Sequence, residues 1–237
     1  FTSWKIASGF IERQQYNGIN NGDIPSLTNA TAFINKTPSV RYFTNFFEGG
    51  NGIADNYGTF FKGYVLPPVD GDYTFFISSD DNSQLFLSTD SNPANKTLIA
   101  LEPTWNNGRQ WQNGNGQDAT RVVYTFSPFI VPPVNRSLPV TLVGGQAYYV
   151  EYLHKEGGGG DNEAVTWYTP LDTAEPVNGS LPMTNQYLGV YVNPDDSIIT
   201  ISAQSGNTNV FEGRRPIFGV TATGQSFFGA ATVFYQW

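Results

Sequence analysis

Apolar and polar residues alternate with a period of two along most of the chain, or the apolar residues form short blocks between Gly, Asn, Asp and Pro. A period of two places successive side chains on opposite faces of a strand, whereas a helix needs a period of about 3.6. The pattern predicts strands at residues 58–67, 71–79, 83–89, 121–126, 138–143, 146–155 and 163–169. Residues 39–47 fit either a strand or a short helix. Many short strands joined by tight turns predict an all-β sandwich or barrel.

The pattern changes near residue 170, where a stretch rich in Pro, Asn and Thr precedes a linker-like segment at residues 191–197. The segments "PIFGVTATG" and "TVFYQW" that follow again have the character of strands, and the last one ends on Trp237. Because an indole at the end of a sheet needs an opposing layer to bury it, we expect a second, incomplete β-domain here. The predicted division is a lead-in strand at residues 1–10, a β-sandwich at 11–191, and a linker with the first strands of another sandwich at 192–237.

The composition predicts a surface that is polar but carries few charges. Hydrophobic residues make up 39% of the 237 residues, enough for a substantial core, but charged residues make up only 14%, against roughly 25% in average soluble proteins. Such surfaces are common in extracellular proteins and in proteins that handle sugars. The net charge is −8 and no cluster of Lys or Arg exceeds a pair, which argues against nucleic acid as a partner and makes a divalent cation plausible.

Several chemistries are excluded by residues that the chain lacks. It contains no cysteine and one histidine, which removes disulfides, thiolate metal sites, cysteine nucleophiles and multi-histidine metal sites. No apolar run approaches the roughly 20 residues that a membrane-spanning helix needs. We therefore expect no membrane insertion in this segment.

Two adjacent aspartates, Asp80 and Asp81, stand between the apolar strands "YTFFISS" and "QLFLS". Successive side chains of an extended strand point to opposite faces, so two ordinary neighbours would diverge. A cis peptide bond between them is one arrangement that would turn both carboxylates toward one ion. Ca²⁺ takes about six to eight hard oxygen ligands, which is more than two aspartates supply.

The remaining oxygens could come from the glycine-rich loop in "HKEGGGGDNEAVTW". Gly157 to Gly160 allow a tight turn that aims backbone carbonyls at a ligand, and Asp161 and Asn162 follow with side-chain oxygens. The alternative is a long hairpin connection that carries solvated charges. His154, on the preceding strand, is interpreted as a structural histidine.

The two blocks "DNYGTFFKGYVLPPVDGDYTFFISSDDNSQLFLSTDSNPANKTLIA" and "GGQAYYVEYLHKEGGGGDNEAVTWYTP" resemble the PA14 family, of the bacterial surface or adhesin type, over roughly residues 10–190. The resemblance implies a β-sandwich in which a cis-linked Asp80–Asp81 pair binds Ca²⁺. It also implies ligands from the glycine-rich loop: the carbonyls of Gly158 and Gly160, and a side chain from Asp161 or Asn162, between which the sequence does not choose. Sugar hydroxyls would complete the coordination. Residues from 194 are similar to the start of a bacterial immunoglobulin-like domain, so the expected fold is a PA14-type β-sandwich followed by a truncated immunoglobulin-like sandwich.

A long polar loop at residues 104–119 contains Trp105 and Trp111. Long loops without regular structure are often functional. Each Trp either plugs the edge of the sandwich or stacks on a sugar. With Asn82 and Glu163, the two tryptophans form the candidate set of sugar contacts. A second acidic pair, Asp195 and Asp196, fits a solvated turn better than a calcium site in the linker.

The function expected from these features is a calcium-dependent carbohydrate-binding or adhesion module of a secreted or cell-surface multidomain protein. Its partners would be glycans or glycoconjugates, and also copies of itself or other surface proteins. The alternative is a structural subunit or repeat of an extracellular fibre or surface layer, in which calcium only rigidifies loops. A glycosidase needs two carboxylates about 5 to 10 Å apart beside a cleft. Glu102, Glu151, Glu156 and Glu163 lack a recognisable acid–base context, so no enzymatic function is expected.

Overall fold

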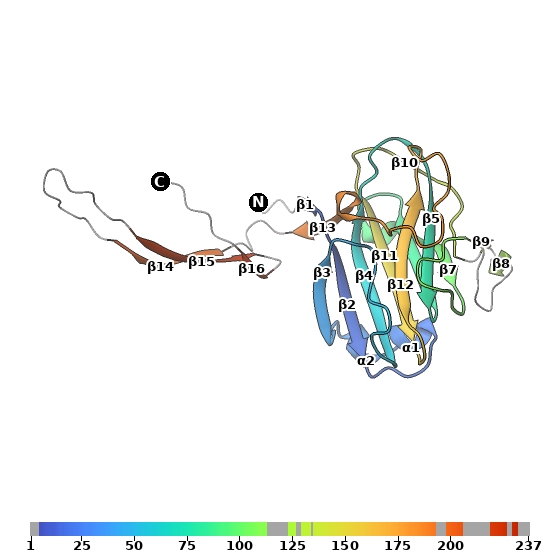
Figure 1. Ribbon diagram of the computed structural model, residues 1–237, viewed down its shortest axis with the longest axis horizontal. Helices are drawn as coiled ribbons and strands as arrows, with labels where there is room; N and C mark the ends of the chain where they lie inside the picture. The colour runs from blue at the N-terminus through green and yellow to red at the C-terminus, as the bar shows by residue number, and fades with distance from the viewer. Residues whose placement is uncertain are drawn as a thin grey trace, which may run out of the picture. The chain divides into compact units, whose positions relative to one another are not determined.

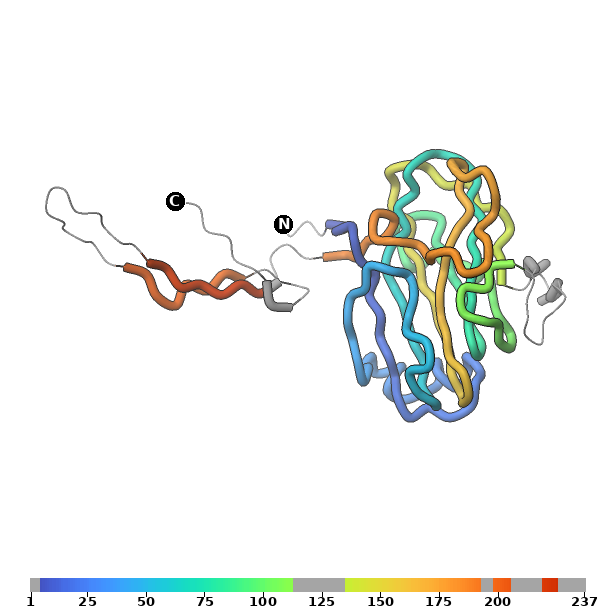
Figure 2. The backbone as a smooth tube through the Cα atoms, in the orientation of Figure 1, coloured from blue at the N-terminus to red at the C-terminus, as the bar shows by residue number. Residues whose placement is uncertain are grey.

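The computed structural model describes residues 5–112, 123–126, 129–133, 135–192, 198–205, 219–226 and 229–231. The chain divides into two compact units, Ile6–Val190 on the one hand and Tyr191–Trp237 with Phe1–Lys5 on the other (Figures 1 and 2). The larger unit contains the two main sheets.

Among the described residues up to 192, the structure has thirteen strands, two short α-helices and two 3₁₀ turns. In chain order they are β1 (Lys5–Ser8), β2 (Ile11–Asn17), α1 (Ile24–Thr28), α2 (Thr31–Ile34), β3 (Val40–Thr44), β4 (Tyr57–Val65), β5 (Gly71–Asp80), β6 (Ser83–Ser88), η1 (Pro93–Asn95), β7 (Lys96–Glu102), β8 (Val123–Phe126), β9 (Phe129–Pro133), β10 (Val140–Leu142), β11 (Tyr148–Glu156), β12 (Asn162–Tyr168), η2 (Asn185–Tyr187) and β13 (Leu188–Val192).

The strands form two facing layers (Figure 1). The larger sheet has the order β1-β13-β4-β11-β6-β7, with β2 also paired to β4 and β3 paired to β2. The smaller sheet has the order β10-β5-β12, and β8 pairs with β9 in a separate hairpin. The expectation of an all-β sandwich is confirmed.

The core lies between the two sheets and is rich in aromatic side chains. Phe61 of β4 and Tyr152 of β11 come from the larger sheet, while Phe75 of β5 and Trp167 of β12 come from the smaller one, and all four belong to one buried cluster. Burial of each such side chain contributes roughly 1.5–3 kcal/mol. The residues of β5 and β12 that alternate with this set face away from the core.

Each of the seven strands expected from the pattern overlaps a strand of the structure, and residues 39–47 contain β3 rather than a helix. The pattern did not predict β2, β7, β9 or β13. It missed β2 because the sequence "IERQQYN" is almost wholly polar. In the structure these side chains are buried and hydrogen-bond to one another, for example Gln14 Nε2 to Glu12 Oε1 at 2.6 Å and Arg13 Nη1 to Gln15 Oε1 at 2.9 Å. Mutual pairing of buried polar groups is what makes such a strand stable.

The short helices cover one end of the outer face of the larger sheet. Helix α1 begins after Asp23, whose Oδ1 accepts a hydrogen bond from the Ser26 amide at 2.9 Å and so caps the helix. Leu27 packs against Tyr16 of β2 and Leu153 of β11. This packing holds the segment before α1 close to the ends of β5 and β11 (Figure 1).

The smaller unit contains a three-stranded antiparallel sheet of β14 (Ile198–Gln204), β15 (Val220–Ser226) and β16 (Gly229–Ala231). The strand expected at residues 232–237 and the acidic pair Asp195 and Asp196 lie outside the described residues. The immunoglobulin-like assignment stays a prediction.

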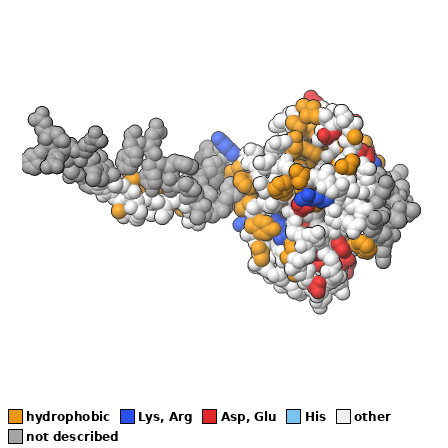
Figure 3. Space-filling model, in the orientation of Figure 1, with side chains coloured by type: hydrophobic (Ala, Val, Ile, Leu, Met, Phe, Trp, Pro, Cys, Tyr) orange, Lys and Arg blue, Asp and Glu red, His pale blue; other side chains and the backbone are white. Residues whose placement is uncertain are grey.

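The surface agrees with the composition. Figure 3 shows a face of the larger unit on which uncharged polar and apolar side chains predominate and charged ones are sparse. Within the described part of the chain, the structure has no helix of the length and apolarity that crossing a membrane requires.

Candidate functional site

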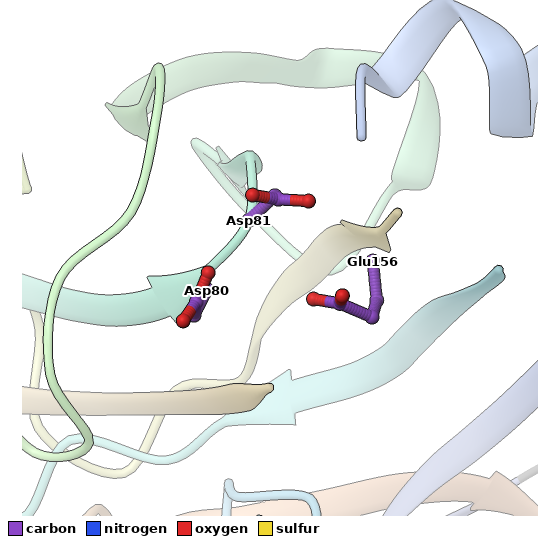
Figure 4. Close-up of side chains that lie close together, drawn as sticks. All are labelled: Asp80, Asp81 and Glu156. Atoms are coloured by element: carbon purple, nitrogen blue, oxygen red, sulfur yellow. The ribbon is translucent and has the colours of Figure 1, made fainter. Parts of the chain in front are cut away.

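Three carboxylates meet where β5 and β11 end. Asp80 is the last residue of β5, its peptide bond to Asp81 is cis, and Glu156 is the last residue of β11. Each supplies an oxygen, and these oxygens all lie within 4.8 Å of one another. Figure 4 shows the three side chains around one space. The sequence singled out the aspartate pair and the cis bond, but it did not identify Glu156 as their partner.

Hydrogen bonds from β11 hold the aspartate pair in place. The Gly157 amide donates to Asp81 Oδ2 at 3.0 Å, and His154 Nε2 donates to the carbonyl oxygen of Asp80 at 2.7 Å. The Lys155 amide donates to the carbonyl oxygen of Asn82 at 2.9 Å. The turn after β5 is therefore fastened to the end of β11 on both sides of the cis bond.

A third segment, residues 21–23, closes one side of the acidic cluster. A Cβ at Gly22 would lie 2.5 Å from Asp81 Oδ2, and a Cβ at Gly157 would lie 3.0 Å from the Gly22 amide nitrogen. Only a residue without a side chain allows this approach. Sequence reasoning missed the segment, whose one local signal is the turn sequence "NNGD" before the helix.

The glycine-rich loop brings two further oxygens toward this end of the sandwich. Asp161 Oδ2 accepts hydrogen bonds from the amides of Ile53 and Ala54, at 2.7 and 3.0 Å, and from the Tyr57 hydroxyl at 3.0 Å. Asn162 stands directly opposite Asp80 in the β12–β5 pairing. Among the described residues, Oδ1 of Asp161 and Oδ1 of Asn162 are both buried without a hydrogen-bond donor.

The same shortage of donors affects Glu156, because both of its carboxylate oxygens are buried and have no donor within the described part of the chain. A buried acceptor without a partner costs about 1–3 kcal/mol. A cation bound among these groups would satisfy them, and a set made only of oxygens suits Ca²⁺ or Mg²⁺ rather than Zn²⁺ or Cu²⁺. Gly158 and Gly160 are exposed in the same loop. The residues fit a hard divalent cation.

The pKa values of the acidic cluster also favour a bound cation. Burial and the neighbouring charge of Asp81 raise the pKa of Asp80 to about 6. Burial, followed by the charges of Asp81 and Asp80, raises the pKa of Glu156 to about 7, although His154 opposes this shift. The charge of Asp161 contributes to both shifts. A bound cation would compensate this excess of negative charge.

We expect calcium affinity to fall by about 100-fold between about pH 7.5 and pH 5.5, because the ion must displace protons from groups with raised pKa values. At the higher pH, Asp80 and Glu156 are largely ionised, whereas at the lower pH both are largely protonated. Isothermal titration calorimetry at the two pH values measures the change. Equal affinity at both would contradict a role for these two carboxylates as ligands.

The Glu163 carboxylate contacts Arg13 and His154 in the interior of the sandwich, and its candidate role as a sugar contact is corrected. Its side chain is fully buried, with Oε1 2.6 Å from Arg13 Nη2 and Oε2 3.2 Å from His154 Nδ1, and Thr59 Oγ1 also donates to it. Burial alone raises the pKa of Glu163, but Arg13 and His154 outweigh it and hold the pKa at about 2. The carboxylate is the centre of an interior ion cluster, and the structural interpretation of His154 agrees with this arrangement.

The two tryptophans have different environments. Trp111 is 0% exposed, packs with Phe76 and Ala164, and donates from Nε1 to the carbonyl oxygen of Ser180 at 3.2 Å. It plugs the outer face of the small sheet, so a sugar-stacking role for Trp111 is wrong. Trp105 is partly exposed and forms an isolated β-bridge with Asp80. Directly opposed residues point to the same face, so Trp105 lies beside the acidic cluster.

Comparisons with known proteins identify the fold. The model of the PA14 domain family matches residues 20–179. Similar solved structures include the epithelial adhesin 9 A domain of Candida glabrata in complex with Galb1-3GlcNAc, at TM-score 0.52 and 11% identity, covering 80% of this chain and 92% of that one. The PA14 sugar-binding domain of an RTX adhesin has TM-score 0.51 and 12% identity, covering 78% of this chain and 99% of that one.

A curated relative bears on enzymatic function. N-acetyl-beta-glucosaminyl-glycoprotein 4-beta-N-acetylgalactosaminyltransferase 1 of Mus musculus is 34% identical over 113 residues, which are 47% of this chain and 10% of that protein. This chain thus spans about a tenth of the length of that relative. The expectation of no enzymatic function is contradicted by this match to a glycosyltransferase. The expectation was drawn from carboxylates within one domain, which cannot exclude that such a domain belongs to an enzyme polypeptide.

The family model extends over more than half of the sequence, and two solved structures share the sandwich over most of their own length. The bacterial type expected from the resemblance is not shown by these matches. On this evidence the chain belongs to the PA14 domain family.

Proposed function

We propose that the domain binds glycans through a calcium ion held at the end of β5 and β11. Asp80, Asp81 and Glu156 supply the central carboxylates, and the glycine-rich loop adds the carbonyls of Gly158 and Gly160 and a side-chain oxygen of Asp161. The observation that carries the proposal is the group of buried oxygens that lack any donor among the described residues. Ca²⁺ bound there would keep coordination positions for two vicinal sugar hydroxyls, because it accepts about six to eight oxygens.

The class of ligand is proposed from the chemistry beside the ion and from the relatives. Trp105 offers an aromatic face next to Asp80, on which the apolar face of a pyranose can stack, and Asn82 offers a half-buried amide directly after the pair. One similar structure is a complex with Galb1-3GlcNAc, and the mouse relative is named for transfer of N-acetylgalactosamine to an N-acetylglucosaminyl glycoprotein. We infer that glycans containing galactose and N-acetylhexosamines are the first to test.

The location of the protein and its domain organisation are also part of the proposal. Adhesin domains among the similar structures support a secreted or cell-surface protein with several domains. Residues from about 192 would then begin an immunoglobulin-like domain, which the antiparallel β14–β15–β16 sheet allows.

We expect Trp105→Ala to weaken sugar binding by roughly 3- to 10-fold through lost stacking, while the affinity for calcium stays unchanged. Titration with galactose and with Galβ1-3GlcNAc, in calcium and again in EDTA, measures both. Phe10→Ala is the control, because Phe10 is an aromatic residue of similar type, 39% exposed, next to the far end of β2. Sugar binding that persists in EDTA would contradict a calcium-dependent function.

A further inference from the structure

Lys155 of β11 is a buried cation that the proposed function does not use. It is 0% exposed, although a lysine is almost never fully buried unless it is paired. Its Nζ donates to the carbonyl oxygen of Glu156 at 2.5 Å, whereas an ammonium group has three donors. Lys155 forms no ion pair with any carboxylate in the described part of the chain. The ammonium therefore lies in the interior without a direct counter-ion, which is a costly arrangement.

The packing of β11 fixes this ammonium behind the acidic cluster. Lys155 and Leu153 point to the same face of the strand, the outer face, on which Leu153 packs against Leu27 of α1. The Lys155 amide donates to the carbonyl oxygen of Asn82, in the turn that follows β5. Glu156, the next residue, turns its side chain to the opposite face. The ammonium thus stands close to the carboxylates without entering the space between them.

The charges that act on Lys155 belong mainly to the acidic cluster. Burial lowers the pKa of Lys155, and the charges of Glu156, Asp81 and Asp23 oppose this lowering. Glu156 and Asp81 are ligands in the proposed calcium site. A positive charge in a protein acts over several ångströms, because the effective dielectric constant is roughly 20 rather than 80. The charge on Lys155 that attracts these carboxylates therefore also repels a cation bound among them.

We propose that Lys155 is an internal counter-charge that weakens calcium binding and keeps the site in exchange with free calcium. The ammonium offsets part of the charge of the cluster when no ion is bound and opposes an ion that binds. The inference rests on the proposed function, because it concerns the affinity of the same calcium site. Calcium sites of extracellular modules bind at about 10⁻⁴–10⁻³ M, and a fixed positive charge beside the ligands favours such weak binding. The domain would then release calcium, and the glycan with it, when the calcium concentration falls.

Three variants separate the charge of Lys155 from its other contacts. Lys155→Met removes the charge and keeps a flexible, unbranched side chain. Lys155→Gln also removes the charge, but it leaves an N–H donor for the Glu156 carbonyl. Lys62→Met is the matched control, because it removes a lysine with a 36% exposed side chain. Lys62 lies four residues along β4 from Gly58, the partner of Lys155 in the β11–β4 pairing, which is a distance of roughly 13 Å.

Isothermal titration calorimetry near pH 7.5, with Ca²⁺ or Tb³⁺ as the added ion, measures the effect. We expect both Lys155 variants to bind Ca²⁺ about tenfold more tightly than the wild type, and Lys62→Met to stay within about twofold. Because the Coulomb energy is proportional to the charge of the ion, the gain for Tb³⁺ should be about 30-fold.

The outcomes distinguish this inference from the proposed function. Unchanged or weaker calcium binding in both Lys155 variants, or equal gains for the two ions, would overturn the role of Lys155 alone. A wild-type chain that binds no Ca²⁺ would overturn the proposed function, and the role of Lys155 with it.

Discussion

Replacing both Asp80 and Asp81 by asparagine is expected to weaken calcium binding by at least about 1,000-fold, because the affinity of such sites varies over decades with the charge of their ligands. The two residues supply two of the three carboxylates whose oxygens lie within 4.8 Å of one another. In the wild-type chain, calcium at about 100 times its dissociation constant should add about 2.7 kcal/mol of stability, a rise in melting temperature of about 5–10 °C. The double variant should show no such rise.

The matched control is the other adjacent acidic pair, Asp195→Asn with Asp196→Asn, which removes the same charge elsewhere in the chain. It should keep the full response to calcium. Without calcium the Asp80/Asp81 variant should be at least as stable as the wild type near neutral pH. Burial and the charge of Asp81 raise the pKa of Asp80 to about 6. This carboxyl therefore contributes its full stability at pH values below its ordinary pKa of 3.8, and the contribution is lost as the pH rises through 6. A retained calcium response in the double variant would refute the assignment of these two ligands.

Glu163→Ala is expected to destabilise the fold by about 3–5 kcal/mol, because it leaves buried cationic groups without their anion. The side chains of Arg13 and His154 are 1% and 0% exposed, and both contact the Glu163 carboxylate. The melting temperature should fall by about 6–20 °C for a domain of this size. Thermal unfolding followed by circular dichroism or calorimetry measures this change.

Glu175→Ala is the comparison, because it removes a carboxylate from Arg136 at the similar distance of 2.7 Å but with side chains that are 34% and 22% exposed. A pair of that exposure contributes about 0–1 kcal/mol. The folded pKa of Glu163, about 2, lies below its ordinary value of 4.5, so its stabilising effect is complete above pH 4.5 and is lost as the pH falls toward 2. Losses of equal size in the two variants would show that the interior ion cluster has no special role in stability.

The ion cluster also has a geometric consequence for the candidate site. His154 contacts Glu163 through Nδ1 and the carbonyl oxygen of Asp80 through Nε2. The chain of contacts from Arg13 to Asp80 therefore links the interior of the sandwich to the first residue of the cis-linked pair. It also gives the buried guanidinium of Arg13 on β2 a carboxylate partner.

The sequence by itself determined the class of fold and the two segments of greatest chemical interest. Alternation with a period of two is a local property of a strand, so β4, β5, β6, β11 and β12 could be placed from the pattern alone. The pair Asp80–Asp81 and the loop from Gly157 to Asn162 stood out because acidic neighbours and runs of glycine are unusual beside apolar strands. For both segments the resemblance to the PA14 family added the expectation that they bind calcium. The family model that matches residues 20–179 shows that the chain belongs to that family.

The tertiary structure alone decided which side chains meet. Glu156 joins the aspartates because β5 and β11 end at the same end of the sandwich, a relation between strands that are remote in sequence. Trp111 and Glu163 are buried and Trp105 is not, since burial depends on which face another segment covers. Spacing along the chain cannot show that a polar strand, β2, finds its partners inside the core. These outcomes follow from the packing of the two sheets, which brings together residues that local patterns describe only one strand at a time.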